Sequence, residues 1–558
     1  MASSTMVLAP PTPTQIAQGM GRVVPAELST SPLVGILGVI MGAGIVTLTG
    51  RMLTLGLADL KGHVGIGFDQ GAWISSAYNV ALMFIGPFTV YLGALLGPKR
   101  ILLFASTMFA VICAFLPLIH NYSLLIVALV FAGLTSGTFY PLTLTFALRN
   151  IPLKFLPFTI ALYAAFVDGA VNIAPTLYGW YRDHLSWQWM FWNSAMITPL
   201  MMVCIYYGIP ATPPGKKSSP VPSFAAFLEA SAGFAMLYAA FDQGERLDWW
   251  RSGVFTALFV AGSYFLLCGL VRRLRSANPL VDLPYLGQWN TVLLGLGLVL
   301  FRFNLLSTII LVPQSLGIHG FEADQIGPAL IWSAIPLLPI AFVAGLFLLA
   351  DLDSRLLMAT GFACMAFAAC LNAQITSAWS ASNYYRTELL LGVGQGFAFI
   401  GLVSTIVLQG IFSLGLSKPQ WILTFSAYFH TLRLFGGELG AVFMGHFIAQ
   451  REKLHSNLTG LYVQHGNWIA DGNIRRLTLG LFSKSPGLDA ATARAIGVMS
   501  GRVRLEAYAL TFIDGFHLLA WSCVAALLLV ALLHKSPLNH GELSASQQQT
   551  PAAQETKS

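Results

Sequence analysis

Long apolar runs separated by short polar segments dominate this chain. A membrane-spanning helix needs about 20 apolar residues, and fourteen runs reach or approach that length. They lie at 33–57, 72–96, 101–120, 122–148, 157–180, 187–208, 223–241, 253–271, 289–315, 326–350, 356–375, 386–413, 420–448 and 508–533. The runs are apolar on all sides, whereas strands of a membrane barrel alternate apolar and polar residues. The pattern therefore predicts an all-α polytopic membrane protein with 14 transmembrane helices.

Composition excludes a water-soluble globular protein. Hydrophobic residues make up 56% of the chain and charged residues only 9%, whereas soluble domains carry about 25% charged residues. Lipid must therefore surround most of the runs, and in lipid each helix satisfies its own backbone hydrogen bonds. The net charge of +7 does not indicate nucleic-acid binding, because Lys and Arg are scattered over short loops. The six cysteines stand singly in apolar runs, so neither a disulfide framework nor a metal site is expected.

The basic residues orient the predicted spans. Cytoplasmic loops of membrane proteins carry an excess of Lys and Arg. With the N-terminus in the cytoplasm, thirteen basic residues fall in cytoplasmic segments and five in short outer loops. The outer segment 450–507 carries eight more, but it approaches the length, about 60 residues, at which the rule ceases to apply. We therefore expect both termini in the cytoplasm.

Polar segments divide the predicted spans into groups of six, two and six. The segment 209–222 is rich in Pro, Gly, Ser and Lys, as linkers are. The expected parts are a cytoplasmic N-terminal tail (1–32), an N-terminal six-helix bundle (33–208), a cytoplasmic linker (209–222), two additional helices (223–271), a second cytoplasmic linker (272–288), a C-terminal six-helix bundle (289–534) with a long periplasmic loop (450–507), and a disordered C-terminal tail (535–558).

Four stretches of local sequence resemble the fourteen-span branch of the major facilitator superfamily. They are FDQGAWISSAYNVA (68–81), LSWQWMFW (185–192), LRLFGGELGA (432–441) and EAYALTFIDGF (506–516), similar to the starts of spans two, six, thirteen and fourteen. The resemblance is colinear over residues 33–534. It implies a major facilitator fold, and its specific relatives are proton-driven drug exporters of the EmrB/QacA kind.

The resemblance also assigns a gating and packing role to two short motifs. Gly97 and Arg100 match the loop between spans two and three. In span five, the residues that match the antiporter motif are Ala170, Ala174, Pro175 and Gly179. Tyr178 stands where that motif has a Gly, so the motif is retained only in part.

Ionisable residues inside predicted spans are the candidates for chemistry. An ionisable side chain costs about 2.5–3.5 kcal/mol at the bilayer centre on insertion scales, so each one calls for a role. Asp168 lies in the middle of span five, and Asn172 and Thr176 follow it at steps of four on one helix face. We expect Asp168 to carry a proton, with Asn172 beside it in the substrate cavity. The alternative is that Asp168 is a structural partner of a buried arginine.

Three arginines are expected to line the substrate cavity. Arg51 lies in span one, Arg302 in span nine, its counterpart in the second bundle, and Arg433 in span thirteen. For Arg51, pairing with Asp168 and snorkelling to the outer interface are alternatives. Glu438 is about 140° round the helix from Arg433, so it is expected to be a second titrating acid or the partner of a basic residue on a neighbouring span.

These features predict a proton-coupled secondary transporter that exports small amphipathic compounds by alternating access. On the same fold, an organic-acid or siderophore exporter and a proton-coupled importer remain alternatives. A membrane-embedded enzyme acting on a lipid-linked substrate is disfavoured, because the charges are scattered over distant spans. No cofactor is expected, since no phosphate-binding Lys motif follows a strand.

The expected partners follow from this function. They are a small-molecule substrate, protons and membrane lipids, without nucleic acid. The resemblance also permits a periplasmic adaptor and an outer-membrane channel, and it implies a multi-pass protein of the bacterial inner membrane.

Overall fold

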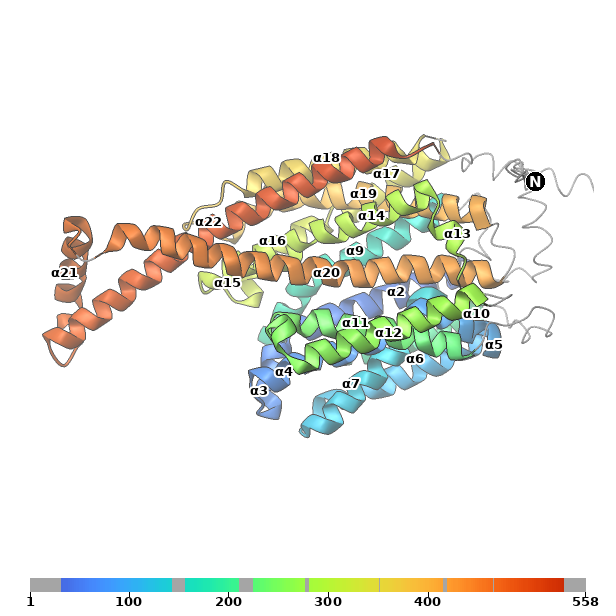
Figure 1. The fold of residues 1–558 in the computed structure, drawn as a ribbon, viewed down its shortest axis with the longest axis horizontal. Helices are drawn as coiled ribbons and strands as arrows, with labels where there is room; N and C mark the ends of the chain where they lie inside the picture. Colours follow the sequence, from blue (N-terminus) through green and yellow to red (C-terminus); the bar gives the residue numbers. More distant parts are fainter. Residues whose placement is uncertain are drawn as a thin grey trace, which may run out of the picture.

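The computed structural model describes residues 32–142, 156–209, 224–275, 281–350, 352–414, 419–464 and 466–535. Within these ranges the regular secondary structure is helical throughout. Nearly all of the predicted N-terminal tail, of the first linker and of the C-terminal tail lies outside the described residues. Most of the long helices run along the long axis of the molecule (Figure 1).

Six membrane-length elements come first in the chain. They are α2 (Pro32–Leu55), the broken helix α4–η1–α5 (Phe68–Ile85, Gly86–Phe88 and Thr89–Leu96), α6 (Pro98–Phe115) with η2 (Leu116–Leu118), α7 (Tyr122–Ser136), α9 (Leu156–His184) and α10 (Trp189–Gly208), with a short α3 (Leu57–Val64) after α2. α2 packs against α9 and α10, α4 against α7, and α6 against α7 and α10. These contacts form the first bundle.

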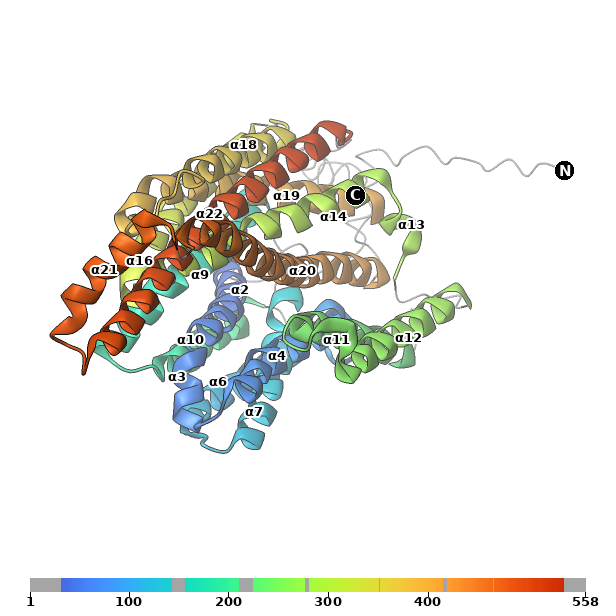
Figure 2. The ribbon, with the colours of Figure 1, turned by 60° about the vertical axis from the view of Figure 1, so that its left-hand side comes forward.

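Two additional helices stand beside the first bundle. α11 (Phe224–Gly244) and α12 (Gly253–Arg275) pack on one another, with the turn η4 (Trp249–Arg251) between them, and α11 also contacts α4 and α20. Figure 2 shows this green pair at the side of the bundle. The outward face of α12 exposes Val260, Tyr264 and Leu267, so lipid must cover it.

The remaining helices form the second bundle. They are α13 (Leu283–Leu286), α14 (Trp289–Asn304), the π-helical turn η5 (Ser307–Leu311), α15 (Val312–Ile318), α16 (Ala323–Ala334), α17 (Leu337–Leu349), α18 (Ser354–Asn372), η6 (Ala381–Tyr384), α19 (Tyr385–Leu414), α20 (Pro419–Gly460), η7 (Leu461–Val463), α21 (Trp468–Phe482) and α22 (Leu488–Leu532). α9 of the first bundle packs against α16, α17 and α19 of the second. The interface between the bundles is built largely on α9.

The described residues contain twelve helices that are long and apolar enough to cross a membrane. The two other predicted spans, 72–96 and 420–448, are also helical but are not among these twelve. The first is interrupted by the turn at Gly86–Phe88, and the second carries His430, Arg433 and Glu438. The all-α fold is confirmed, while the number fourteen remains a prediction that these helices permit.

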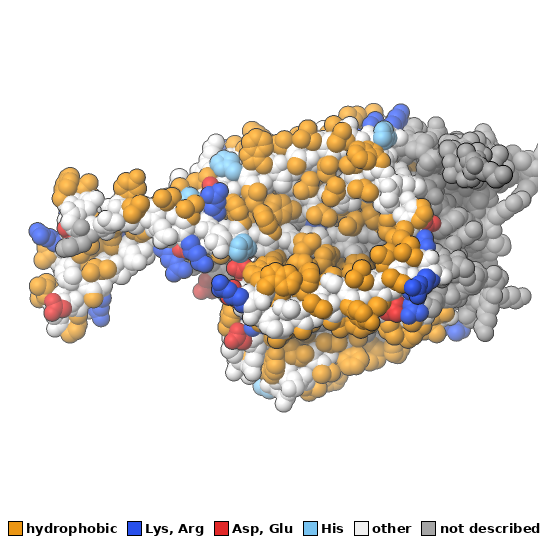
Figure 3. All heavy atoms as spheres, in the orientation of Figure 1, with side chains coloured by type: hydrophobic (Ala, Val, Ile, Leu, Met, Phe, Trp, Pro, Cys, Tyr) orange, Lys and Arg blue, Asp and Glu red, His pale blue; other side chains and the backbone are white. Residues whose placement is uncertain are grey.

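An apolar surface surrounds the helical body. Figure 3 shows hydrophobic side chains over its middle and charged side chains gathered toward its two ends. Large side chains such as Phe104 on α6 and Trp521 on α22 are exposed there. A surface of this kind needs lipid rather than water, as a multi-pass membrane protein requires.

The segment predicted as the periplasmic loop 450–507 continues the helices of its neighbours. α20 runs on to Gly460, α22 already begins at Leu488, and α21 lies between them. Figure 1 shows this outer hairpin projecting beyond the other helices, with α21 at its tip. The predicted limits did not coincide with helix ends because residues such as Arg451, Glu452 and Lys453 are too polar for a span but are good helix formers.

Candidate transport site

Asp168 is buried at the centre of the interface between the two bundles. Its side chain belongs to α9 and is 1% exposed, and neither carboxylate oxygen has a hydrogen-bond partner among the described residues. The charges that act on it are the guanidinium groups of Arg302 on α14 and Arg433 on α20. An acid of the first bundle thus faces two cations of the second without direct contact.

Arg433 crosses the interface between the bundles. Its guanidinium carbon lies 3.8 Å from the centre of the Tyr140 ring, and its Nη2 donates to Thr47 Oγ1 at 3.3 Å. His430, one turn earlier on α20, packs edge-on against the same Tyr140 ring, with ring centres 5.3 Å apart. Stacking of a cation on an aromatic ring stabilises by about 0.5–2 kcal/mol. The aromatic ring therefore fixes the charge of Arg433 beside the first bundle.

Arg302 occupies the space left by a glycine. A Cβ on Gly437 would lie 3.1 Å from both Nε and Nη2 of Arg302. The charge of Arg302 acts on Asp168, Tyr140 and Tyr238. Gly437 on α20 therefore leaves room for the Arg302 guanidinium, whose charge acts both on Asp168 and on Tyr238 of α11.

Glu438 lies at the seam where α20 meets the additional helix α11. The Tyr238 hydroxyl donates to Glu438 Oε2 at 2.6 Å, and Asp242, one turn further along α11, lies beside the same carboxyl group. Asp242 itself accepts hydrogen bonds from the Ser76 hydroxyl and from Gln243 Nε2. A pair of acids, Glu438 and Asp242, therefore joins α4, α11 and α20.

Arg51 does not pair with Asp168. Its Nη2 donates to the Ile309 carbonyl oxygen at 3.1 Å. Ile309 belongs to the π-helical turn η5, and Pro313, four residues later, has no amide hydrogen to donate to that carbonyl. Arg51 supplies the missing donor and ties α2 to the second bundle, which corrects both the Asp168 pair and the snorkelling alternative.

Asn172 links α9 to α19. Its Nδ2 donates to Gln395 Oε1 at 2.8 Å, and both side chains are buried. Asn172 Oδ1 and Gln395 Nε2 have no partner among the described residues. One turn from Asp168, this amide pair therefore keeps one unpaired acceptor and one unpaired donor among the described residues.

The retained glycine of the span-five motif lies at a close helix contact. A Cβ on Gly179 would stand 2.7 Å from Asp324 Cα on α16, and one on Gly327 would stand 2.6 Å from Thr176 Cα on α9. Thr176 Oγ1 donates to the Gly327 carbonyl at 2.8 Å. Ala174 and Pro175 are buried in the same stretch, and Ala170 is partly buried. The two glycines allow the backbones of α9 and α16 to touch.

Ionic contacts reinforce this closure at the end of the molecule predicted to face outward. Arg182, near the end of α9, contacts Glu322 and lies 3.7 Å from an Asp324 oxygen at the start of α16. Tyr178, which replaces the motif glycine, donates its hydroxyl hydrogen to Asp59 on α3. The outer end between α9 and α16 is therefore closed in this structure.

The loop motif lies at the opposite end. Gly97 joins α5 to α6 with φ +91°, a conformation that favours glycine. Lys99 Nζ donates to the Tyr206 carbonyl at 2.7 Å and lies 4.9 Å from the centre of that ring. Arg100 is exposed. Lys99 therefore makes a contact between this motif and α10.

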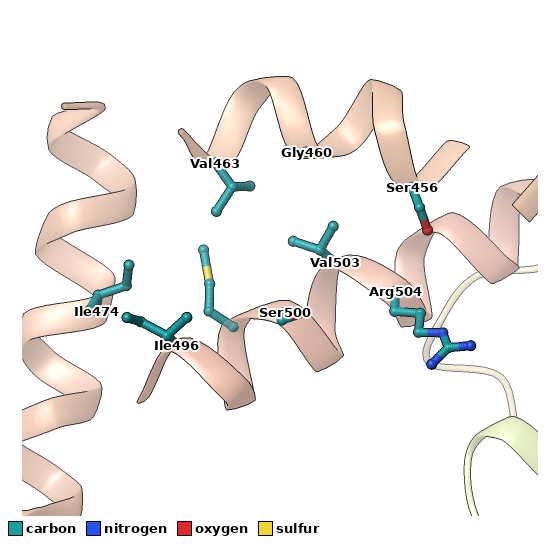
Figure 4. A pocket seen from close by; sticks show the side chains of 9 residues that line it. Ser456, Gly460, Val463, Ile474, Ile496, Ser500, Val503 and Arg504 are labelled. Atoms are coloured by element: carbon teal, nitrogen blue, oxygen red, sulfur yellow. The ribbon is translucent and has the colours of Figure 1, made fainter. Parts of the chain in front are cut away.

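A cavity of about 380 Å³ lies in the outer hairpin, away from Asp168. Figure 4 shows Val463, Ile474, Ile496 and Val503 around it, from η7, α21 and α22. Because these helices project beyond the bundles, this cavity is separate from the candidate transport site.

Comparison with known proteins identifies the family. The model of the Major Facilitator Superfamily matches residues 39–409. The chain belongs to the major facilitator superfamily. It is therefore a membrane transporter rather than an enzyme, as the sequence predicted, and its substrates are small molecules.

Several curated relatives are similar over most of this transporter. The probable multidrug resistance protein EmrY of Escherichia coli (strain K12) is 26% identical, covering 72% of this chain and 78% of its own. The multidrug export protein EmrB of Haemophilus influenzae is 24% identical, covering 73% and 79%. The fatty acid resistance protein FarB of Neisseria gonorrhoeae is 22% identical, covering 71% and 76%. The predicted resemblance to transporters of the EmrB kind is confirmed.

Solved structures confirm the fold. The human organic anion transporter MFSD10 (TETRAN) aligns with a TM-score of 0.52 at 13% identity, covering 89% of this chain and 99% of that one. The proton:xylose symporter XylE aligns with a TM-score of 0.53 at 11% identity, covering 93% and 99%. At these identities the likeness concerns the fold alone.

Proposed function

We propose that this transporter exports small amphipathic compounds in exchange for protons, from the inner membrane of a bacterium. The observation that carries the proposal is the placement of Asp168, which is buried without a hydrogen-bond partner among the described residues and faces Arg302 and Arg433 across the bundle interface. The multidrug export named for the EmrB relatives supports the substrate class. The four-helix contact around α9 supplies a place where two bundles rock about a midplane site.

Competition for Asp168 couples the two fluxes. A buried carboxylate is costly when it is ionised and unpaired, and the two arginines lower that cost. The acid can then release its proton when a donor group of the substrate takes the proton's place. Asn172 and Gln395 present an unpaired acceptor and an unpaired donor one turn away, so they orient the substrate. A proton and a substrate thus occupy the same site in alternation.

The outer hairpin serves as a docking surface for a periplasmic adaptor that leads to an outer-membrane channel. It projects beyond the bundles (Figure 1) and exposes large apolar side chains, including Tyr462, Trp468 and Leu479. Exposed apolar patches on a surface that meets water mark interaction sites. Cross-linking from position 468 in whole cells tests this partner. A cross-linked product that contains only lipid or a second copy of this chain contradicts it.

Transport into everted membrane vesicles tests the proposed exchange. Vesicles acidified inside present the cytoplasmic face of the transporter to the medium. We expect them to accumulate fluorescent amphipathic compounds, with cations and anions tested as separate arms, and to release them when an ionophore collapses the pH gradient. Accumulation that is unaffected by the ionophore contradicts proton coupling, and export of neither class contradicts the substrate assignment.

A further inference from the structure

Glu388 is a buried acid outside the transport site. It lies in the first turn of α19, is 0% exposed, and neither carboxylate oxygen has a hydrogen-bond partner among the described residues. The polar groups that face it are the Ser333 hydroxyl on α16 and the Tyr384 phenol on η6. Over the described part of the chain, no charged side chain faces it.

The Ser333 hydroxyl donates its hydrogen to the Leu330 carbonyl at 2.7 Å in this structure. A protonated Glu388 can donate its own O–H to the Ser333 oxygen while that bond stays in place. An ionised Glu388 would have to draw the Ser333 hydrogen away from Leu330, and it would still be a buried charge without a charged partner among the described residues, which is strongly disfavoured.

Close packing leaves no room to hydrate the ionised acid while α16 and α19 stay together. One turn after Glu388, a Cβ on Gly392 would lie 2.2 Å from the Ser333 carbonyl oxygen. On its other side, α16 makes the closure of the outer end, through Gly327 against Thr176 and through Glu322 against Arg182. Any separation of α16 from α19 therefore acts on the helix that closes the outer end.

We propose that Glu388 is a second proton-binding site, loaded from the outer face, whose protonation seats α16 on α19 and holds the outer end closed. The outer solution is near, because Asn383 and Arg386 of the same region are exposed. The proposal deepens the proposed function and rests on it: an exporter driven by protons takes them from outside after releasing its substrate, and loading at Glu388 favours the closure that must follow.

Hydrogen–deuterium exchange of the purified full chain across a pH series tests this site. After correction for the chemical exchange rate, we expect exchange in α16 to rise several-fold as the pH is raised in the unmutated chain. Glu388→Gln, which keeps the shape of the neutral acid, is expected to hold exchange low at every pH. Glu506→Gln removes an exposed acid at the same end, one that accepts from Ser377 at 2.6 Å, and is expected to behave as the unmutated chain.

Three results overturn the proposal. Exchange in α16 could respond to pH in Glu388→Gln as it does in the unmutated chain, or it could fail to respond in the unmutated chain. The third result is loss of the response in Glu388→Asp, which keeps a titrating group. The Glu388→Asp arm decides even where Glu388→Gln does not fold. Asp168→Asn is expected to keep the response, so failure of coupling through Asp168 is distinguished from failure of this inference.

Discussion

The guanidinium of Arg51 replaces a main-chain donor that Pro313 lacks, by donating to the carbonyl of Ile309 at 3.1 Å. This bond runs from the first bundle to the second, so the helix defect on one side is satisfied only while the two bundles meet at this end. The π-helical turn that presents the carbonyl thereby becomes part of the closure of the outer end.

Loss of the Arg51 donor is expected to depend on Pro313. Arg51→Met removes this donor from a partly buried carbonyl and is expected to cost about 1–3 kcal/mol in the free energy of unfolding. Pro313→Ala restores an amide hydrogen four residues after Ile309, so Arg51→Met is expected to cost less in that background. Denaturant unfolding of the two single variants and the double variant measures the difference. Equal costs in both backgrounds contradict the assignment.

The stacking of Arg433 on Tyr140 is expected to appear as a coupling between the two residues. Arg433→Lys keeps the charge but loses the planar group that covers the ring, and Tyr140→Leu removes the ring. We expect a coupling of about 0.5–2 kcal/mol in a double-mutant cycle of stability. Strictly additive costs would show that the 3.8 Å contact contributes nothing.

The sequence predicts those parts of this arrangement whose signal is spread over many neighbouring residues. Hydropathy identifies the spans, because burial in lipid acts on every residue of a long run. The same signal places Asp242 one residue beyond the predicted span 223–241 and Glu388 only two residues inside the predicted span 386–413, so neither is among the candidates. Gln395 carries no charge, so a search for ionisable residues inside the spans does not find it.

Partners across the interface depend on contacts that no local pattern contains. Asp168 was identified as a buried acid, but its two facing arginines come from helices more than a hundred residues away. The acceptor of Arg51 is a main-chain oxygen, which has no sequence signature except the proline that follows it. The assignment of Arg51 and of the other candidates to the substrate cavity stays a prediction.

A side chain at Gly179 is expected to prevent closure of the outer end. Gly179→Ala places a Cβ 2.7 Å from Asp324 Cα, a backbone atom that cannot turn aside. Overpacking of this kind costs about 1–3 kcal/mol, so we expect transport to fall roughly ten- to a hundredfold while the protein still inserts. Gly445→Ala on α20, where nothing lies within 4 Å, is the matched control. Initial transport rates that are equal in both variants contradict the role of this contact.

Acid is expected to loosen α3 through His63. This residue lies outside the membrane-length helices, with its ring centre 4.3 Å from that of His120 and 4.9 Å from that of Trp187. Burial, followed by the charge of His120, lowers the pKa of His63 from its usual 6.5. Since the unfolded segment binds the proton more readily, stability of this packing falls as the pH drops below about 6.5.

The measurement is hydrogen–deuterium exchange in residues 57–64, which we expect to rise as the pH is lowered. His63→Phe keeps a ring in the cluster without a titrating group and is expected to remove the acid sensitivity. The same acid-induced loosening in His63→Phe would assign the effect to other groups.

Proton flux in proteoliposomes tests most directly the claim that Asp168 couples transport to protons. Purified protein would be reconstituted and exposed to amphipathic cations and anions in turn under an imposed pH gradient, with Asp168→Asn and Glu506→Gln beside the unmutated chain. We expect substrate-dependent proton flux in the unmutated chain and in Glu506→Gln, and none in Asp168→Asn despite normal insertion. Undiminished substrate-dependent flux in Asp168→Asn would contradict the account.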